Sequence, residues 1–402
     1  MTNMMDYLAW RGDLTFDQAP FCEIDALILA AFSYNELGDR VRDAKGMPLR
    51  DLAPLLNLKE RRGNAFFTQR RDLLYAMAES ARYGRLIVHD YEDDMDEALH
   101  KQFGAVSVTL PDGNEAVAFR GTNSTLVGWH EDFNMCFASP VPAQQEAVDY
   151  LNRIAAGTDG RIITTGHSKG GNLAAWAAAF SNEDAKEKLC AVYSFDGPGF
   201  EDGAADTDGY RRVEPMIHSI IPESSVIGLM LNSHQGYEVV KSDAVSLLQH
   251  DAFKWHVKGP AFERAGEVNL SSRIIDGTVR SYLAEASREE RAQFVSTIFR
   301  VLEATGATTT GEISASALKS AASMVTATAS LDEKQKNLLF ETISRMITLG
   351  LQSTKEQVTT SMPERLRELG GRLISGVQDI SSTIQNLADQ AGIKTKDGGN
   401  NA

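Results

Sequence analysis

Cysteine is scarce in this sequence, and its placement argues against two kinds of scaffold. Among 402 residues only Cys22, Cys136 and Cys190 occur, an odd number without the paired spacing of a zinc site. Neither a disulfide framework nor a structural metal is expected, and a few unpaired thiols are typical of a cytoplasmic protein.

Long hydrophobic runs are also missing. No stretch reaches the roughly 18 consecutive apolar residues of a transmembrane helix. The first residues, Met1 to Gly12, carry Asp6 and no apolar run, so no secretory signal is predicted. We therefore expect a cytoplasmic protein without stable membrane insertion.

Basic charge is in deficit, with 40 Lys and Arg against 55 Asp and Glu and a net charge of −15. Nucleic acid is therefore not expected as a partner, because its phosphates would repel the chain. Residues 270–402 are neutral, so the whole acidic excess lies before them. The contiguous acidic run Glu92 to Glu97 lacks the spacing of a calcium loop and predicts a solvated face. No P-loop, dinucleotide fingerprint or zinc-ligand spacing occurs, so no cofactor or metal is predicted.

Hydrophobic residues make up 43% of the chain, enough for a sizeable core. Residues 21–100 show mostly helical spacing, and strands then alternate with helices as far as residue 248. The expected strands are 105–110, 116–119, 161–165, 189–195, 215–221, 237–241 and 244–248. Helices are expected between them at 144–156 and 172–180. This alternation predicts an α/β fold with a mostly parallel sheet flanked by helices.

Beyond residue 270 the strand patterns stop, and an all-α C-terminal appendage is predicted. Ser272 to Thr305 is expected to be helical, and Ser330 to Glu333 has the pattern of a capping box. A last helix opening at Ser361 carries an apolar stripe that suits helix packing, self-association or a partner helix. The predicted domains are therefore residues 1–270 and 271–402, with a disordered tail from about residue 394.

The strongest chemical signal is Gly166-His-Ser-Lys-Gly170, a G-x-S-x-G sequence between an apolar strand and an Ala-rich helix. That context lets Ser168 sit on a tight strand-to-helix turn with its hydroxyl above the sheet. Side chains at the flanking positions would collide in such a turn, which explains both glycines. Ser168 is the predicted nucleophile, and a Gly-rich structural turn is the alternative.

Acyl-transfer chemistry also needs two donors for an oxyanion. The backbone N–H of Lys169, directly after the serine, supplies one in this interpretation. The N–H and hydroxyl of Thr122, in an Arg-Gly-Thr turn at the end of an upstream strand, supply the other.

These segments resemble a known family. Phe119-Arg-Gly-Thr-Asn-Ser124 with Trp129 and Asp132, the Ser168 motif, and Phe195-Asp-Gly-Pro198 are similar to class 3 (fungal-type) lipases. The resemblance implies an α/β-hydrolase fold, with Thr122 in the oxyanion hole and Ser168 as the nucleophile. The chain resembles the bacterial Mbeg-like family more closely, on its opening segment Asp6-Tyr-Leu-Ala-Trp-Arg-Gly-Asp13 and on Gln249-His-Asp-Ala-Phe-Lys-Trp255.

The general base should be a late histidine, because hydrolases of this fold carry serine, acid and histidine in that order. His167 adjoins the serine and is expected to point elsewhere, which leaves His234, His250 and His256 as late candidates. His250 is favoured because Trp255 follows it at a distance similar to that in class 3 lipases. His234 is the alternative base.

The acid is less clearly marked. Class 3 lipases carry an Asp just after the strand that corresponds to 215–221, whereas this chain offers Glu223 there. Asp196, at the end of the preceding strand, lies in a stretch that resembles pancreatic-type lipases. A carboxylate at either strand end can hold the tautomer of the histidine, and Asp196 is favoured over Glu223.

The sequence thus predicts a cytoplasmic serine hydrolase that cleaves a small-molecule carboxylic ester without a cofactor. By resemblance the ester is lipid-derived, and thioester or amide hydrolysis is a further option. The alternative from another class is a catalytically inactive hydrolase-fold scaffold, which the extra helical region would suit.

Overall fold

A computed structural model describes residues 2–56, 65–123, 125–135, 138–201, 203–231, 236–244 and 246–303, with residues 306, 328, 330–339, 341–342, 345 and 349. The chain forms two compact units, one of residues 1–123 and 139–268, the other of residues 124–138 and 269–402. Residues 124–138 thus group with the second unit although residues of the first unit precede and follow them in the chain. Within the described ranges, no helix has both the length and the apolar character needed to cross a membrane.

The first unit is built on an eight-stranded sheet whose strands follow one another in chain order. The strands are β1 (Met47–Pro48), β2 (Ile87–Asp96), β3 (Lys101–Thr109), β4 (Glu115–Phe119), β5 (Ile162–His167), β6 (Leu189–Phe195), β7 (Ile217–Pro222) and β8 (Glu238–Val240). Pairs from β1 to β4 are antiparallel, and pairs from β4 to β8 are parallel. A small hairpin joins β9 (Val257–Lys258) to β10 (Ala261–Phe262). The sheet is of the predicted α/β-hydrolase type.

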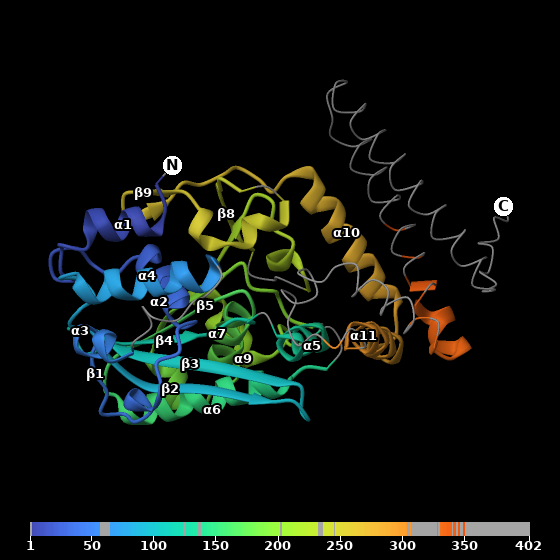
Figure 1. Cartoon of the computed structure of the whole chain (residues 1–402), viewed down its shortest axis with the longest axis horizontal. Helices are drawn as coiled ribbons and strands as arrows, with labels where there is room; N and C mark the ends of the chain where they lie inside the picture. Colours follow the sequence, from blue (N-terminus) through green and yellow to red (C-terminus); the bar gives the residue numbers. More distant parts are fainter. Residues whose placement is uncertain are drawn as a thin grey trace, which may run out of the picture. The chain divides into compact units, whose positions relative to one another are not determined.

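Helices cover both faces of this sheet (Figure 1). The N-terminal helices are α1 (Met4–Arg11), α2 (Glu23–Phe32), α3 (Leu49–Leu52) and α4 (Ala65–Glu79), and the later ones are α6 (Pro142–Gly157), α7 (Lys169–Phe180), α8 (Glu183–Lys188) and α9 (Asp208–Val213). Val106 and Ala118 pack with α2 and α4, whereas Ala105, Val117 and Phe119 pack with α6 and α7. Because successive side chains of a strand point to opposite faces, β3 and β4 contribute to two apolar cores.

Strand β2 corrects the expectation that residues 21–100 are mostly helical. It includes most of the acidic run, which pairs with basic side chains rather than forming a simple solvated face. Glu92 pairs with Arg153, Asp93 with Arg120, and Asp94 with Lys101. The long acidic strand is tolerated because cations from neighbouring elements offset its repulsion.

A buried ion pair fixes helix α2 against the segment after α4. The side chains of Asp25 and Arg82 are both fully buried, with Arg82 Nη2 2.6 Å from Asp25 Oδ2. The hydroxyls of Tyr7 and Tyr83 also donate to this carboxylate. A buried charge needs such partners to offset its lost hydration, so α2 is held in one position.

The second unit contains α5 (Leu126–Asn134), α10 (Leu270–Glu285) and α11 (Arg288–Glu303). The single helix expected at 272–305 is broken because Ser287 and Glu290 form a capping box, with Ser287 N–H donating to the Glu290 carboxylate over 2.7 Å. The later box is formed by Asp332 and Gln335 rather than by Ser330 and Glu333. The helix expected from Ser361 and the tail from residue 394 lie outside the described residues.

Candidate active site

Ser168 occupies the turn between β5 and α7. Its backbone has φ 59° and ψ −132°, a conformation that L-residues rarely adopt. The N–H of Ser168 donates to the carbonyl of Phe195 over 2.9 Å, and its carbonyl accepts from the N–H of Gly171 over 2.9 Å. These bonds fix the strained turn between β5 and the end of β6, and the Ser168 side chain keeps partial exposure.

The two glycines of the motif are needed for space. A Cβ on Gly166 would lie 2.0 Å from the carbonyl oxygen of Gly170, and one on Gly170 would lie 2.2 Å from that of Phe119. Both distances are far below van der Waals contact, so any side chain would push the turn open. This crowding is the collision expected from the sequence for any side chain at the two glycine positions of the motif.

His250 and Asp196 form the titratable pair of the site. Nδ1 of His250 lies 2.6 Å from Oδ2 of Asp196, and Asp196 is fully buried at the end of β6. Its other oxygen accepts from the Gly228 N–H over 3.1 Å and from the Ser225 hydroxyl. A carboxylate only accepts, so Nδ1 carries a proton, and in the neutral tautomer that this bond selects Nε2 is the basic nitrogen. The His250 side chain is 30% exposed, so this nitrogen belongs to an accessible ring.

The segment that carries His250 differs from the expected strand. A strand was expected over 244–248, whereas residues Ser246–His250 form a 3-10 helix. At this edge of the sheet, Arg264 forms an isolated antiparallel bridge with Val240 of β8, and Trp255 forms one with Ser242. The indole N–H of buried Trp255 donates to the Gln249 carbonyl over 2.7 Å, which anchors the turn beside His250.

The alternative acid is Glu223, and the alternative base is His234. Glu223 follows β7 and donates its backbone N–H to the Val240 carbonyl over 3.1 Å, whereas the bond to His250 Nδ1 is made by Asp196. His234 lies outside the described residues.

Of the two expected oxyanion donors, Lys169 lies within the turn Gly166–Gly170, which we call the elbow, and Thr122 follows a segment that lies against it. Lys169 is the first residue of α7, where backbone N–H groups point out of the helix, and its buried ammonium donates to the Gln102 carbonyl over 2.7 Å. A Cβ on Gly121 would lie 2.4 Å from the His167 carbonyl and 3.2 Å from Ser168 Cβ. The segment that leads into Thr122 therefore passes directly against the serine. Trp129 and Asp132 of the same motif lie on α5, in the second unit.

Two residues of the site were missed by the sequence argument. His167 Nε2 lies 2.8 Å from the backbone carbonyl of His250, and His167 Nδ1 lies 3.3 Å from the hydroxyl of Tyr34. Neither contact has a local signal, because the partners are separated by 83 and 133 residues.

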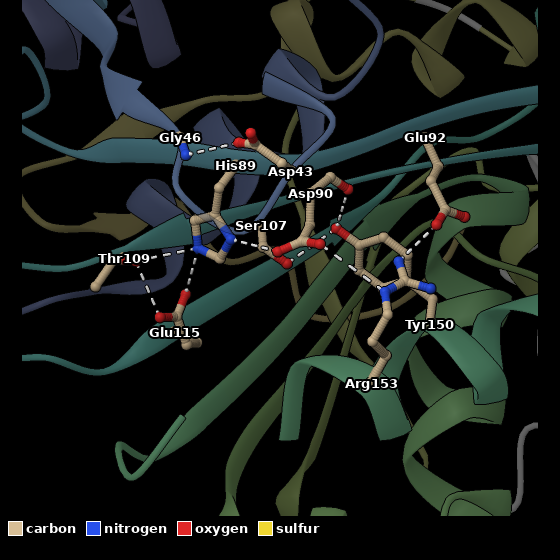
Figure 2. Close-up of polar contacts among 10 residues, drawn as sticks. All are labelled: Asp43, Gly46, His89, Asp90, Glu92, Ser107, Thr109, Glu115, Tyr150 and Arg153. Carbon is tan, nitrogen blue, oxygen red and sulfur yellow. Dashed lines mark hydrogen bonds and ion pairs between the residues drawn. The ribbon is translucent and has the colours of Figure 1, made fainter. Parts of the chain in front are cut away.

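A second histidine cluster includes Glu115 at the start of β4, which pairs with the start of β5, whereas the elbow lies at the end of β5. Figure 2 shows this cluster. The two nitrogens of His89 contact carboxylates, Nδ1 at 2.8 Å from Asp90 and Nε2 at 3.0 Å from Glu115. The Thr109 hydroxyl also lies 3.0 Å from His89 Nε2, and the Tyr150 hydroxyl donates to the backbone carbonyl of Asp90 over 2.8 Å. Burial lowers the pKa of His89, but the hydrogen bonds and charges of Asp90 and Glu115 outweigh it and raise the pKa to about 9. Across the described ranges, no group of side chains has the makeup of a metal site.

The fold and the elbow define the class as an α/β-hydrolase-type protein. The chain belongs to the Mbeg1-like family, whose model matches residues 77–300, more than half of the chain. A solved structure of M37 lipase is similar over 52% of this chain and 70% of that chain, at 13% identity and a TM-score of 0.35. Among curated proteins, none is recognisably similar in sequence.

Proposed function

We propose that this protein is a serine hydrolase that cleaves carboxylic esters through an acyl-serine intermediate. The observation that supports it most is the 2.6 Å bond between His250 Nδ1 and buried Asp196, formed by the turn that contacts the Ser168 elbow. A histidine oriented in this way presents its unprotonated nitrogen as a general base.

The reaction follows from these groups. Ser168 Oγ attacks the acyl carbonyl while His250 Nε2 takes its proton, and Asp196 stabilises the resulting imidazolium. The N–H groups of Thr122 and Lys169 hold the oxyanion. His250 then protonates the departing alkoxide, and the same nitrogen activates the water that hydrolyses acyl-Ser168.

An apolar acyl chain is the substrate feature that this site favours. Leu248, two residues before His250, has 71% of its surface exposed. A large apolar side chain exposed on the same short helix as the base can offer hydrocarbon contact to an ester. We therefore propose a lipid-derived ester, cleaved in the cytoplasm.

The test is labelling by a fluorophosphonate and hydrolysis of p-nitrophenyl esters by wild type and Ser168→Ala. Loss of both signals in the variant is expected. The control is Ser181→Ala, which removes a buried hydroxyl just beyond the other end of α7, where it donates to the Ala178 carbonyl. Equal labelling of Ser168→Ala and wild type would exclude the acyl-serine mechanism and favour an inactive scaffold.

A further inference from the structure

His167, the residue before the nucleophile, contacts the turn that carries His250. The two imidazole rings lie with their centroids 4.6 Å apart, and His167 is 5% exposed. Its Nε2 is 2.8 Å from the backbone carbonyl of His250. The buried His167 side chain thus connects β5, the strand that leads to Ser168, with the backbone of His250.

The partners of His167 determine its tautomer. A carbonyl oxygen only accepts, so Nε2 of His167 must carry the proton. Burial, followed by the charges of His250 and Arg70, holds the pKa of His167 well below its usual 6.5. The ring is therefore neutral. The Tyr34 hydroxyl lies 3.3 Å from both the Nδ1 and the backbone carbonyl oxygen of His167, two acceptors that share its one proton.

Tyr34 is itself held firmly. It lies just beyond α2, and the guanidinium of Arg70 lies 4.6 Å from the centre of its ring. Its hydroxyl occupies the space that a Cβ on Gly121 would need, at 2.1 Å, beside the turn that leads to Thr122. A chain of contacts therefore runs from Tyr34 through His167 to His250.

We propose that His167 is a positioning residue, a role that rests on the proposed function. Its Nε2–H tethers the main chain of His250 to the elbow and thereby sets the approach of His250 Nε2 to Ser168. A neutral ring suits this task, because a second cation 4.6 Å away would oppose the positive charge that His250 gains in the reaction.

The test compares His167→Leu with His167→Gln, whose amide N–H retains a donor directed at the His250 carbonyl. Displacement of a catalytic group by about 1 Å lowers rates by roughly 100-fold. We expect His167→Leu to lower kcat and the rate of fluorophosphonate labelling roughly 10- to 100-fold with KM unchanged. His167→Gln should recover most of this loss, and Tyr34→Phe should show a smaller loss.

The matched control is Thr165→Val. It lies two residues earlier in β5, is fully buried, and donates its hydroxyl to the Ala26 carbonyl of α2, without contact to the His250 turn. It should keep the wild-type kcat. If His167→Leu does not fold, Tyr34→Phe and His167→Gln are compared with wild type instead. The positioning role then predicts a lower kcat with an unchanged KM in Tyr34→Phe and a nearly wild-type kcat in His167→Gln.

Three results would overturn the positioning role. One is a wild-type kcat in His167→Leu, or in Tyr34→Phe where only that variant folds. Another is an equal loss in the Leu and Gln variants. The third is wild-type protein that is not labelled at Ser168, in which case the proposed function fails and this role fails with it. If wild type is labelled at Ser168 and His167→Leu keeps the wild-type kcat, only the positioning role is excluded.

Discussion

The first unit contains two histidine clusters, one around His89 and one around His250. Both bond Nδ1 of the histidine to an aspartate, and they differ in the surroundings of Nε2. In each, Nδ1 bonds to an aspartate whose backbone has positive φ, 47° at Asp196 and 49° at Asp90. His89 has a second carboxylate, Glu115, at Nε2 and is buried, whereas His250 is 30% exposed and bonds to a carboxylate through Nδ1. The two carboxylates raise the pKa of His89 to about 9, so it is mostly an imidazolium near neutral pH, while a single carboxylate at Nδ1 leaves the other nitrogen to take up and return a proton.

The largest effect should come from the aspartate of the accessible cluster. Asp196→Asn is expected to lower kcat by about 10⁴-fold, because an amide facing Nδ1 no longer holds the tautomer that keeps Nε2 basic. Steady-state hydrolysis of a p-nitrophenyl ester measures this. Glu223→Gln is the matched control and should leave kcat unchanged. The reverse ranking of the two variants would make Glu223 the acid.

His89→Gln should affect stability and leave kcat per folded molecule unchanged. His89 has a folded pKa of about 9, raised from 6.5, so its contribution is fully present below pH 6.5 and is lost as pH rises through about 9. The shift corresponds to about 3 kcal/mol in the free energy of unfolding. Urea unfolding at pH 6 and pH 10 should show a wild-type advantage that closes at the higher pH. An advantage that is the same at both pH values would mean that His89 is not an imidazolium in the folded protein.

The smallest effect concerns the apolar surface beside His250. Leu248→Ser should lower kcat/KM for a long-chain ester about fivefold, from the loss of roughly 1 kcal/mol of apolar contact. The acetate ester should be unaffected, because its acyl group is too short to use Leu248. A chain-length series of p-nitrophenyl esters measures this. Equal loss on every ester would indicate a disturbed His250 turn instead of an acyl contact.

Much of the fold follows from local patterns. The strand from Leu189 to Phe195 was predicted with its observed bounds, and the helices before and after the elbow begin two and three residues earlier than predicted. The strand β2 was missed because its second half is a run of acidic residues, which has no alternating apolar pattern. Cations from other elements, Arg120, Lys101 and Arg153, offset that charge in the fold.

The elbow was predictable because the whole constraint lies within five consecutive residues, from Gly166 to Gly170. For the partner of His250 the sequence favoured Asp196 and left Glu223 open, since both directly follow strands and the fold decides which one lies at Nδ1. The contacts of His167 with Tyr34 and with the His250 carbonyl were not predictable, because they join residues 133 and 83 positions apart.

By itself, the sequence determined the α/β type of the sheet, the tight turn at Ser168 and its glycines, because these depend on neighbouring residues and on hydrophobic period. Tertiary structure decided which carboxylate meets His250, which histidine is held as a cation, and what holds the His250 turn against the elbow. Those choices depend on contacts between residues that lie 26, 54 and 83 positions apart, and no local pattern records contacts over such separations.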